Sequence, residues 1–321
     1  MSRPILIALV LCAALLASAV AALGVGSHGL SLRELLSALA GEPGLARDIV
    51  VQVRWPRAAA ALACGALLSL AGVLLQVLLR NPLADPYVLG ISGGAALGVL
   101  LAMLAGLAAW VLPLTGFAGA FAAAVLVFAL GYRAGDWNLY RLLLTGVVLA
   151  AGCGAVVSLV LVLAPAAAVK GMLFWLMGDL SGVSVSWPAW IVALVLGAGA
   201  TAFGGMLNVL ALGRQQAAVL GVPVSAAETA LYASAALATV SAVMLGGTIG
   251  FVGLIVPHLV RLLGVADLRW LIPLSMLAGA AFLCLADTLA RALFAPLQLP
   301  VGVLTALLGV PVMLLLLGRR P

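Results

Sequence analysis

The chain reads RNPLADPYVLGISGG over residues 80–94, and this stretch separates two runs that are too apolar for water. Pro82 and Pro86 lie four residues apart, so a regular helix cannot continue across them. Non-helical backbone at membrane depth persists only where protein or a wet cavity satisfies its polar groups. The stretch therefore predicts a functional break between two membrane helices, of the kind that lines a path.

The composition around this break is that of an integral membrane protein. Of 321 residues, 66% are hydrophobic and 7% are charged, and the mean hydropathy is +1.34. We expect an all-α integral membrane protein with about ten transmembrane helices, because a barrel would show short alternating segments. The expected spans are 5–24, 58–79, 88–110, 112–132, 142–164, 188–207, 227–246, 250–264, 270–290 and 300–318. The connections between them are too short for an independent soluble core, so residues 1–321 form a single transmembrane domain.

The arginines suggest an orientation. An even number of spans places both termini on one side, and Arg3, Arg319 and Arg320 indicate that this side is the cytoplasm. Arg54, Arg57 and Arg291 then lie at outer helix ends. Two interpretations stay open for them. They are interfacial anchors, with Arg291 pairing with Asp287 four residues earlier, or they form a basic rim that faces an acidic partner.

A second polar segment, at about 208–225, falls between two spans on the predicted cytoplasmic side. We expect a short helix here, closed by Gly221 and stopped by Pro223, with Ser225 and Glu228 forming a capping box for the next span. Such a helix projects Arg214, Gln215 and Gln216 on one side and Ala218, Val219 and Leu220 on the other. It is suited to a groove in a partner protein, although an ordinary loop is the alternative.

The remaining residues argue against an enzyme. No acid is paired with a second acid or a histidine at catalytic spacing, and no phosphate-binding GxxxxGK[ST] occurs. The glycine-rich run 246–261, GGTIGFVGLIVPHLVR, predicts close backbone packing, and His258 within it has no second ligand at helical spacing. We therefore expect no metal site, no cofactor bound by this chain and no nucleic-acid partner.

Three motifs in order resemble the permease subunits of the bacterial ATP-driven importers for ferric siderophores, haem and cobalamin. They are NPLADP with SGGAALG (81–98), GTIGFVGLIVPHLVRLLG with LADTLAR (247–291), and LPVGVLTALLG (299–309). The resemblance covers nearly the whole chain. It implies type II ABC importer permease architecture: a ten-helix subunit of the bacterial inner membrane that dimerises with a second copy. It further implies two copies of a cytoplasmic ABC ATPase, which carry ATP and Mg²⁺, and a periplasmic substrate-binding protein.

The same resemblance implies roles for particular residues. Arg54, Arg57 and Arg291 resemble arginines that dock the binding protein, and Asn81, Pro82 and Leu83 resemble residues at the cytoplasmic gate of the pathway. The ATPase-coupling residues would be Arg214, Gln215, Gln216, Leu220, Gly221, Val222 and Pro223. The connection Asp136–Tyr140 departs from the family pattern, so no second gate is assigned there.

Two questions stay open at this point. The cargo is a ferric siderophore, haem or cobalamin, because in this family the binding protein selects the cargo. The alternative function is a secondary transporter driven by an ion gradient, which would act without an ATPase. Such a transporter ordinarily needs a carboxylate or histidine within a span, and Asp287 is the best candidate.

Overall fold

The computed structural model describes residues 3–26, 29–133, 136–183 and 186–318. Arg319 and Arg320, which carry part of the orientation argument, lie outside these ranges. The regular secondary structure of the described residues is helical apart from one pair of short antiparallel strands, in which Tyr132 pairs with Trp137 and Arg133 with Asp136. The elements, in order, are α1 (Arg3–Gly24), α2 (Leu32–Leu39), α3 (Leu45–Asp48), the π-helix η1 (Ile49–Arg54), α4 (Trp55–Leu78), the 3₁₀-helix η2 (Pro86–Leu89), α5 (Ile91–Leu104), the 3₁₀-helix η3 (Ala109–Val111), α6 (Leu112–Gly131), β1 (Tyr132–Arg133), β2 (Asp136–Trp137), α7 (Leu139–Leu163), α8 (Ala166–Leu176), α9 (Trp187–Ala202), α10 (Gly204–Ala211), α11 (Arg214–Val219), α12 (Val224–Gly246), α13 (Val252–Leu262), α14 (Leu268–Ala292) and α15 (Val301–Gly318).

The expected all-α membrane fold is confirmed. Among the described residues, six helices are long and apolar enough to cross a membrane, and the pair α9 and α10 makes a seventh if its 66° bend is one broken span. The expected spans 88–110 and 250–264 correspond to shorter apolar helices, Ile91–Leu104 and Val252–Leu262. A span count of about ten is therefore roughly consistent with the structure once the shorter helices α5, α13 and α15 are included.

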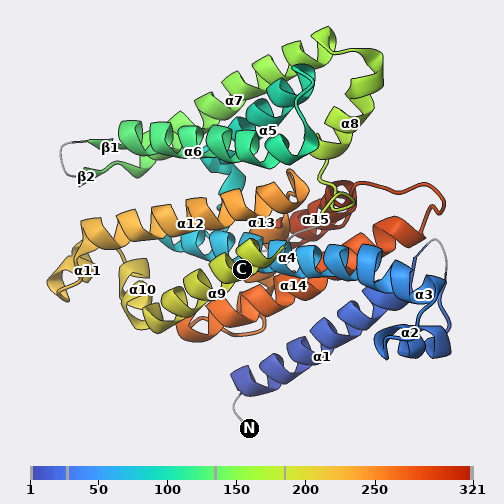
Figure 1. Ribbon diagram of the computed structural model, residues 1–321. Helices are drawn as coiled ribbons and strands as arrows, with labels where there is room; N and C mark the ends of the chain where they lie inside the picture. Colours follow the sequence, from blue (N-terminus) through green and yellow to red (C-terminus); the bar gives the residue numbers. More distant parts are fainter. Residues whose placement is uncertain (1–2, 27–28, 134–135, 184–185, 319–321) are drawn as a thin grey trace.

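Helix α4 forms the centre of the molecule (Figure 1), with α12 and α14 as its main neighbours. Its 24 residues give a length of about 36 Å at 1.5 Å per residue, enough to cross a hydrocarbon core of about 30 Å. Two glycines let neighbouring backbones approach it. A Cβ on Gly65 would lie 2.2 Å from the carbonyl oxygen of Gly279, and one on Gly72 would lie 1.9 Å from that of Gly253. This second contact confirms close packing by the glycine-rich run.

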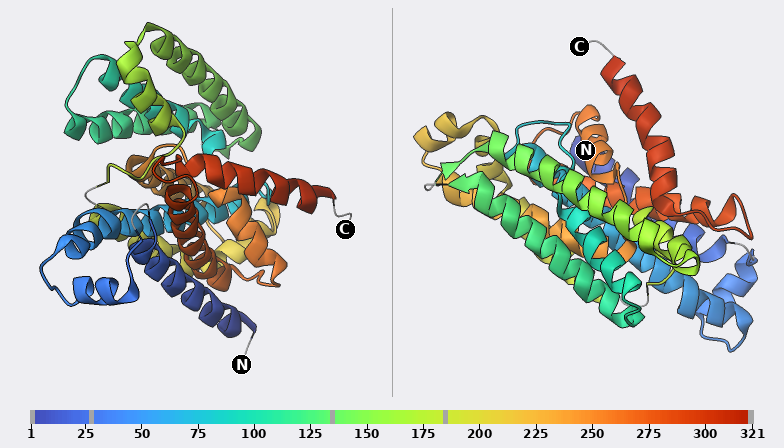
Figure 2. Two further views of the ribbon diagram at one scale, coloured as in Figure 1. Left: turned by 90° about the vertical axis from the view of Figure 1, so that its right-hand side faces the viewer. Right: turned by 90° about the horizontal axis from the view of Figure 1, so that it is seen from above.

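Helices α5, α6 and α7 form a second layer, at the top of Figure 1, and α8 closes one end of it. A small separate core lies between α5, α7 and α8, formed by Ala96, Leu100, Val157, Val160 and Met172. Helix α15 projects away from the rest of the bundle (Figure 2).

The bundle has two ends, which carry different short helices. We call them the α2 end, where α4 begins and α14 ends, and the α11 end, where α4 ends and α12 begins.

Two expected connections contain more structure than the sequence indicated. Residues 166–176, in the expected polar connection 165–187, form α8, which packs on α5. In the expected connection 25–57, Ser31 and Glu34 form a capping box that opens α2, and the helix that becomes α4 already begins at Leu45. Helix α8 and helix α2 are both shorter than a span, so hydropathy alone does not distinguish either of them from a loop.

Candidate functional site

The predicted break between α4 and α5 is confirmed. Helix α4 ends at Leu78, and the chain continues as turns and the short helix η2 until α5 begins at Ile91. Asp85 caps η2 by accepting a hydrogen bond of 2.8 Å from the Tyr87 backbone amide. We call residues 80–90 the break loop. Its three predicted gate residues are exposed in the single chain: Asn81, Pro82 and Leu83.

The break loop is fixed to the glycine-rich run ahead of α13. The Tyr87 hydroxyl donates a hydrogen bond of 3.0 Å to the Ile249 carbonyl oxygen and accepts one of 2.9 Å from the Ile249 amide. A Cβ on Gly253 would lie 2.8 Å from the Pro86 ring. The two most unusual stretches of the sequence therefore lie side by side in the fold.

The predicted short helix in the segment 208–225 is confirmed as α11, and Gly221 closes it as expected. Gly221 has a φ of 81°, and the amide of Val222 donates to the Ala217 carbonyl oxygen at 3.0 Å, the pattern of a Schellman motif. Ala217 is the buried residue of α11, whereas Val219 is 88% exposed and Leu220 is 63% exposed. This helix, which lies at the α11 end of the bundle (Figure 1), therefore carries exposed apolar side chains.

The predicted capping box of Ser225 with Glu228 is wrong. The residue that precedes α12 is Pro223, and no side chain caps this helix. Glu228 instead lies inside the fold, with its side chain 2% exposed. Its Oε1 atom lies 3.3 Å from Nε of Arg214 and 3.8 Å from Nη2 of Arg80. We call Arg80, Arg214 and Glu228 the Glu228 cluster.

A second contact fixes the segment that carries α11. The Asn208 side chain in α10 donates a hydrogen bond of 2.7 Å to the Asp267 carboxylate and accepts one of 2.9 Å from the Leu268 amide. The Asn208 hydrogen bond, followed by that from the Arg269 backbone amide, lowers the pKa of the Asp267 carboxyl below its usual value. Helix α10 is thereby attached to the start of α14.

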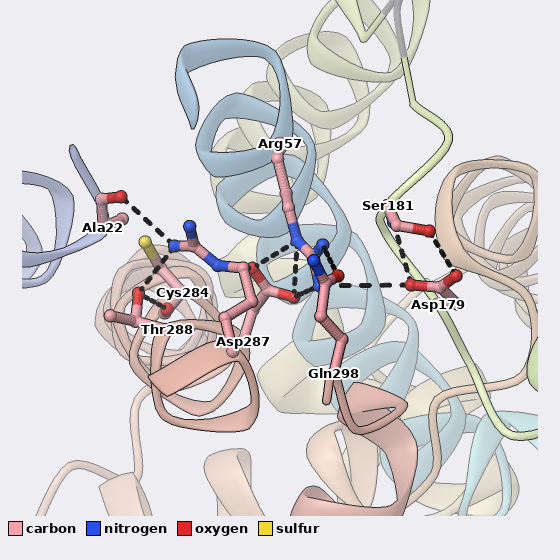
Figure 3. A network of polar contacts seen from close by, with 9 residues as sticks. Ala22, Arg57, Asp179, Ser181, Cys284, Asp287, Thr288 and Gln298 are labelled. Carbon is pink, nitrogen blue, oxygen red and sulfur yellow. Dashed lines mark hydrogen bonds and ion pairs between the residues drawn. The ribbon is translucent and has the colours of Figure 1, made fainter. Parts of the chain in front are cut away.

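At the α2 end, a second buried carboxylate is held by arginines (Figure 3). Arg57 binds Asp287 through Nε at 2.9 Å and 3.1 Å and through Nη2 at 2.8 Å, and its Nη1 donates to Gln298 at 3.0 Å. Arg291 forms an ion pair of 3.3 Å with Asp287 and donates to the Ala22 carbonyl oxygen at 3.1 Å. Asp179 lies 4.0 Å from Arg57. We call this group the Asp287 network.

The expected i,i+4 pair of Asp287 with Arg291 is confirmed, and the bidentate partner Arg57 was not expected. Arg54 lies nearby and donates hydrogen bonds of 2.7 Å and 2.8 Å to the carbonyl oxygens of Leu23 and Gly24. All three arginines are buried, with exposures of 4% for Arg54, 5% for Arg57 and 7% for Arg291. The geometry favours the interpretation that they join helices within the chain. Their role in docking a binding protein stays a prediction.

The sequence contained one signal for the Glu228 cluster that we did not use. Glu228 falls inside the expected span 227–246, and an ionisable residue in a span indicates a function by default. The three-residue spacing from Ser225 indicated a local partner for Glu228, whereas Arg80 and Arg214 are distant from it in the sequence.

Among the described residues, no group of three or more histidines, cysteines, aspartates or glutamates could hold a metal ion.

Comparison with known proteins agrees with this architecture. The sequence pattern of the FecCD transport family matches residues 13–319. The chain is 41% identical over 282 residues to the hemin transport system permease protein HmuU of Yersinia pestis, covering 85% of this chain and 84% of HmuU. It is 41% identical over 286 residues to the cobalamin import system permease protein BtuC of Halobacterium salinarum, covering 87% and 76% of the two chains.

A solved structure extends this likeness to the fold. It is an inward-facing conformation of an ABC transporter of the metal-chelate type, which aligns with a TM-score of 0.85 and 31% identity over 99% of this chain and 100% of that one. The resemblance expected from the three sequence motifs is confirmed. The chain belongs to the FecCD transport family.

Proposed function

We propose that this chain is the permease subunit of an ATP-driven importer, and that it passes a ferric siderophore, haem or cobalamin from a periplasmic binding protein into the cytoplasm by alternating access. Hemin and cobalamin are named for its relatives HmuU and BtuC, and a metal chelate for its structural neighbour. The permease lies in the bacterial inner membrane with both termini cytoplasmic, so that the α11 end faces the cytoplasm.

The observation that carries the proposal is the outward apolar surface of α11. Exposed apolar residues along a span face lipid, but Leu212, Val219 and Leu220 lie beyond the spans, where α10 has turned 66° from α9. Exposed apolar side chains that cluster outside the spans are typical of a surface that contacts another protein. We infer that α11 docks into a groove of an ATPase subunit, which binds ATP and Mg²⁺, while this chain itself binds no cofactor.

Helix α15 supports assembly of two copies. It leaves the bundle (Figure 2), so the rest of this chain does not cover its exposed apolar residues, which include Leu307 at 64%, Leu314 at 64% and Leu315 at 70%. A second permease chain would cover part of this surface. Two permeases would then bind two ATPase subunits, and the break loops with Asn81, Pro82 and Leu83 would meet at the inner end of the shared pathway.

The Asp287 network bears on the alternative transport mechanism. A secondary transporter would use the carboxylate of Asp287 for its coupling ion, but two guanidinium groups already hold that carboxylate. The docking proposal for Arg54, Arg57 and Arg291 has a geometric requirement of its own. An acidic partner would have to draw these side chains out of contacts within the chain, most of all Arg57 from Asp287.

The test is purification of the chain from its native membrane in mild detergent, with mass spectrometry of its partners. An ATPase in about equal amount is the expected result, and a chain that transports alone on an ion gradient would refute the proposal. Leu220→Asp should abolish co-purification of the ATPase. The matched control is Leu39→Asp, which makes the same change at a 54% exposed leucine in α2, at the opposite end of the bundle.

A further inference from the structure

The Glu228 cluster joins three segments that are far apart in the sequence. Arg80 begins the break loop, Arg214 begins α11, and Glu228 lies in the second turn of α12. A carboxylate removed from water is costly unless cations compensate it. Glu228 therefore forms ion pairs with both arginines. These pairs attach α11, which we assign to the ATPase contact, to the break loop, which we assign to the pathway.

Arg80 adopts a left-handed backbone conformation that favours glycine. The Asn81 amide donates to the Gln76 carbonyl oxygen at 3.1 Å and the Arg80 amide donates to that of Val77 at 3.2 Å, so α4 ends in the same Schellman pattern as α11. Gly221 takes the left-handed position after α11, with a φ of 81°, whereas Arg80 takes it after α4, with a φ of 49°. Glycine adopts this conformation freely and arginine does not.

The Arg80 guanidinium also reaches the joint between α10 and α11. A Cβ on Gly213, in the turn between these helices, would lie 3.9 Å from Nη1 of Arg80. Arg80 and Arg214 share a surface hollow of about 560 Å³ whose lining is completed by Leu212, Gly213, Gln215 and Gln216. A movement of α11 toward or away from the bundle would thus change the surroundings of Arg80 directly.

The exposure of the two arginines suits a joint that rearranges. Arg80 and Arg214 form ion pairs of 3.8 Å and 3.3 Å with the buried Glu228 carboxylate. The arginine side chains are 33% and 29% exposed, so water is available to either guanidinium when it leaves the carboxylate. A role limited to stabilising the start of α12 does not explain an arginine at a position where glycine costs less.

We infer that Glu228 is a positioning residue that transmits the movement of α11 to the break loop, by holding Arg214 and Arg80 to one buried carboxylate. Displacement of α11 by its partner shifts Arg214, changes the charge balance at Glu228 and so releases or tightens Arg80. This inference rests on the proposed function, because it assigns α11 to the ATPase contact and the break loop to the pathway.

The experiment uses the complete transporter, with permease, ATPase and binding protein, in liposomes. Haemin, a ferric siderophore and cobalamin serve in turn as the cargo probe. The measured quantity is cargo moved per ATP hydrolysed. Arg80→Gly is the decisive variant, because it removes the guanidinium and leaves a residue that suits the backbone. We expect normal assembly with the ATPase, ATP hydrolysis within about twofold of the wild type, and at least a tenfold loss of cargo moved per ATP.

Glu228→Gln should give the same uncoupling. Arg80→Gly combined with Glu228→Gln should lose no more coupling than either single change, because both changes remove the same contact. The matched control is Arg141→Ala, which removes another exposed arginine at the α11 end, in α7, and should transport normally.

The outcomes separate the two proposals. A wild-type chain that neither binds an ATPase nor uses ATP refutes the proposed function. A wild-type chain that transports, with Arg80→Gly moving as much cargo per ATP, refutes the inference alone. Loss of ATPase binding in Arg80→Gly would also refute it, since Arg80 would then act in docking and not in transmission.

Discussion

The Asp287 network and the Glu228 cluster each place one buried carboxylate between two arginines, yet they are built differently. At Asp287 the contacts with Arg57 are bidentate, at 2.8–3.1 Å, and both arginines are less than 10% exposed. At Glu228 the ion pairs with Arg214 and Arg80 measure 3.3 Å and 3.8 Å, and both arginine side chains are about a third exposed. The first joins long helices that pack closely, and the second joins a loop and a six-residue helix.

The difference indicates what each carboxylate does. Dry, bidentate pairs between rigid helices are costly to separate, so the Asp287 network holds the α2 end in one arrangement. The Glu228 carboxylate is equally buried, but water reaches both of its arginines, so we expect these pairs to separate at a lower cost than those of Asp287 and to allow movement at the α11 end. The same residue types thus form a fixed joint at one end of α4 and an adjustable joint at the other.

The largest expected effect is at the fixed joint. Arg57→Ala leaves the Asp287 carboxylate buried with Arg291 alone, and loss of one partner of a buried pair lowers stability by about 3–5 kcal/mol. Adding Asp287→Asn should not recover this loss, because the buried Arg291 guanidinium then loses the carboxylate with which it pairs at 3.3 Å. Thermal unfolding of the purified protein in detergent measures both. A double variant more stable than Arg57→Ala would show that the pair of Asp287 with Arg291 does not stabilise the fold.

The next effect compares the carboxylates directly. Asp287→Asn removes the carboxylate shared by two buried guanidinium groups and leaves Arg57 with Asp179 at 4.0 Å, whereas Glu228→Gln leaves two guanidinium groups that water can reach. We expect Asp287→Asn to be the more destabilising by on the order of 2 kcal/mol. The same unfolding assay ranks them. Equal losses would mean that the two joints are alike and would remove the basis of the comparison.

A smaller effect tests the strain at Arg80. Arg80→Ala and Arg80→Gly both remove the guanidinium, but alanine keeps a Cβ in the left-handed conformation. The glycine variant should therefore be the more stable of the two by about 1 kcal/mol. If the Arg80→Ala variant is as stable as the Arg80→Gly variant, the left-handed backbone conformation at residue 80 does not strain the protein.

The smallest effect is a dependence on salt. Arg214→Ala should lower stability at low ionic strength by less than Arg57→Ala does, because Arg80 still faces the buried Glu228 carboxylate and water reaches the site from the arginine side. The loss should shrink as salt rises toward 1 M, where the Debye length is about 3 Å. The Arg57→Ala loss serves as the control and should stay nearly constant, because water and ions do not reach Asp287. A stability loss for Arg214→Ala that does not change with salt concentration would contradict the proposal of an adjustable joint.

Much of the fold could be predicted because its causes are local in the sequence. Pro82 and Pro86 interrupt the helix by their own geometry, Gly221 closes α11 by its own freedom, and apolar runs mark the long spans. Helix α8 was missed because its 11 residues, with Lys170 among them, are too few to span a membrane and gain their stability from packing on α5.

The sites could be predicted less well because their partners are distant. The pair of Asp287 with Arg291 follows from helical spacing, but Arg57 meets Asp287 across 230 residues. Glu228 was assigned to Ser225, three residues away, whereas its partners are Arg80 and Arg214. Local patterns show which residues are unusual, and only the packing of helices shows which of them meet.

The burial of α4 has a consequence for biosynthesis. In the stretch Leu45–Leu78, 89% of the most apolar window is buried, and the main covering helices, α12 and α14, follow α4 in the chain. At about 5–20 residues per second, the 230 residues that separate Arg57 from Asp287 take on the order of ten to fifty seconds to synthesise. During that interval the central helix lies in the membrane without α14, and Arg57 reaches interfacial water because it is near the helix end. The nascent chain is therefore most exposed to premature degradation or mispairing before its last third has entered the membrane.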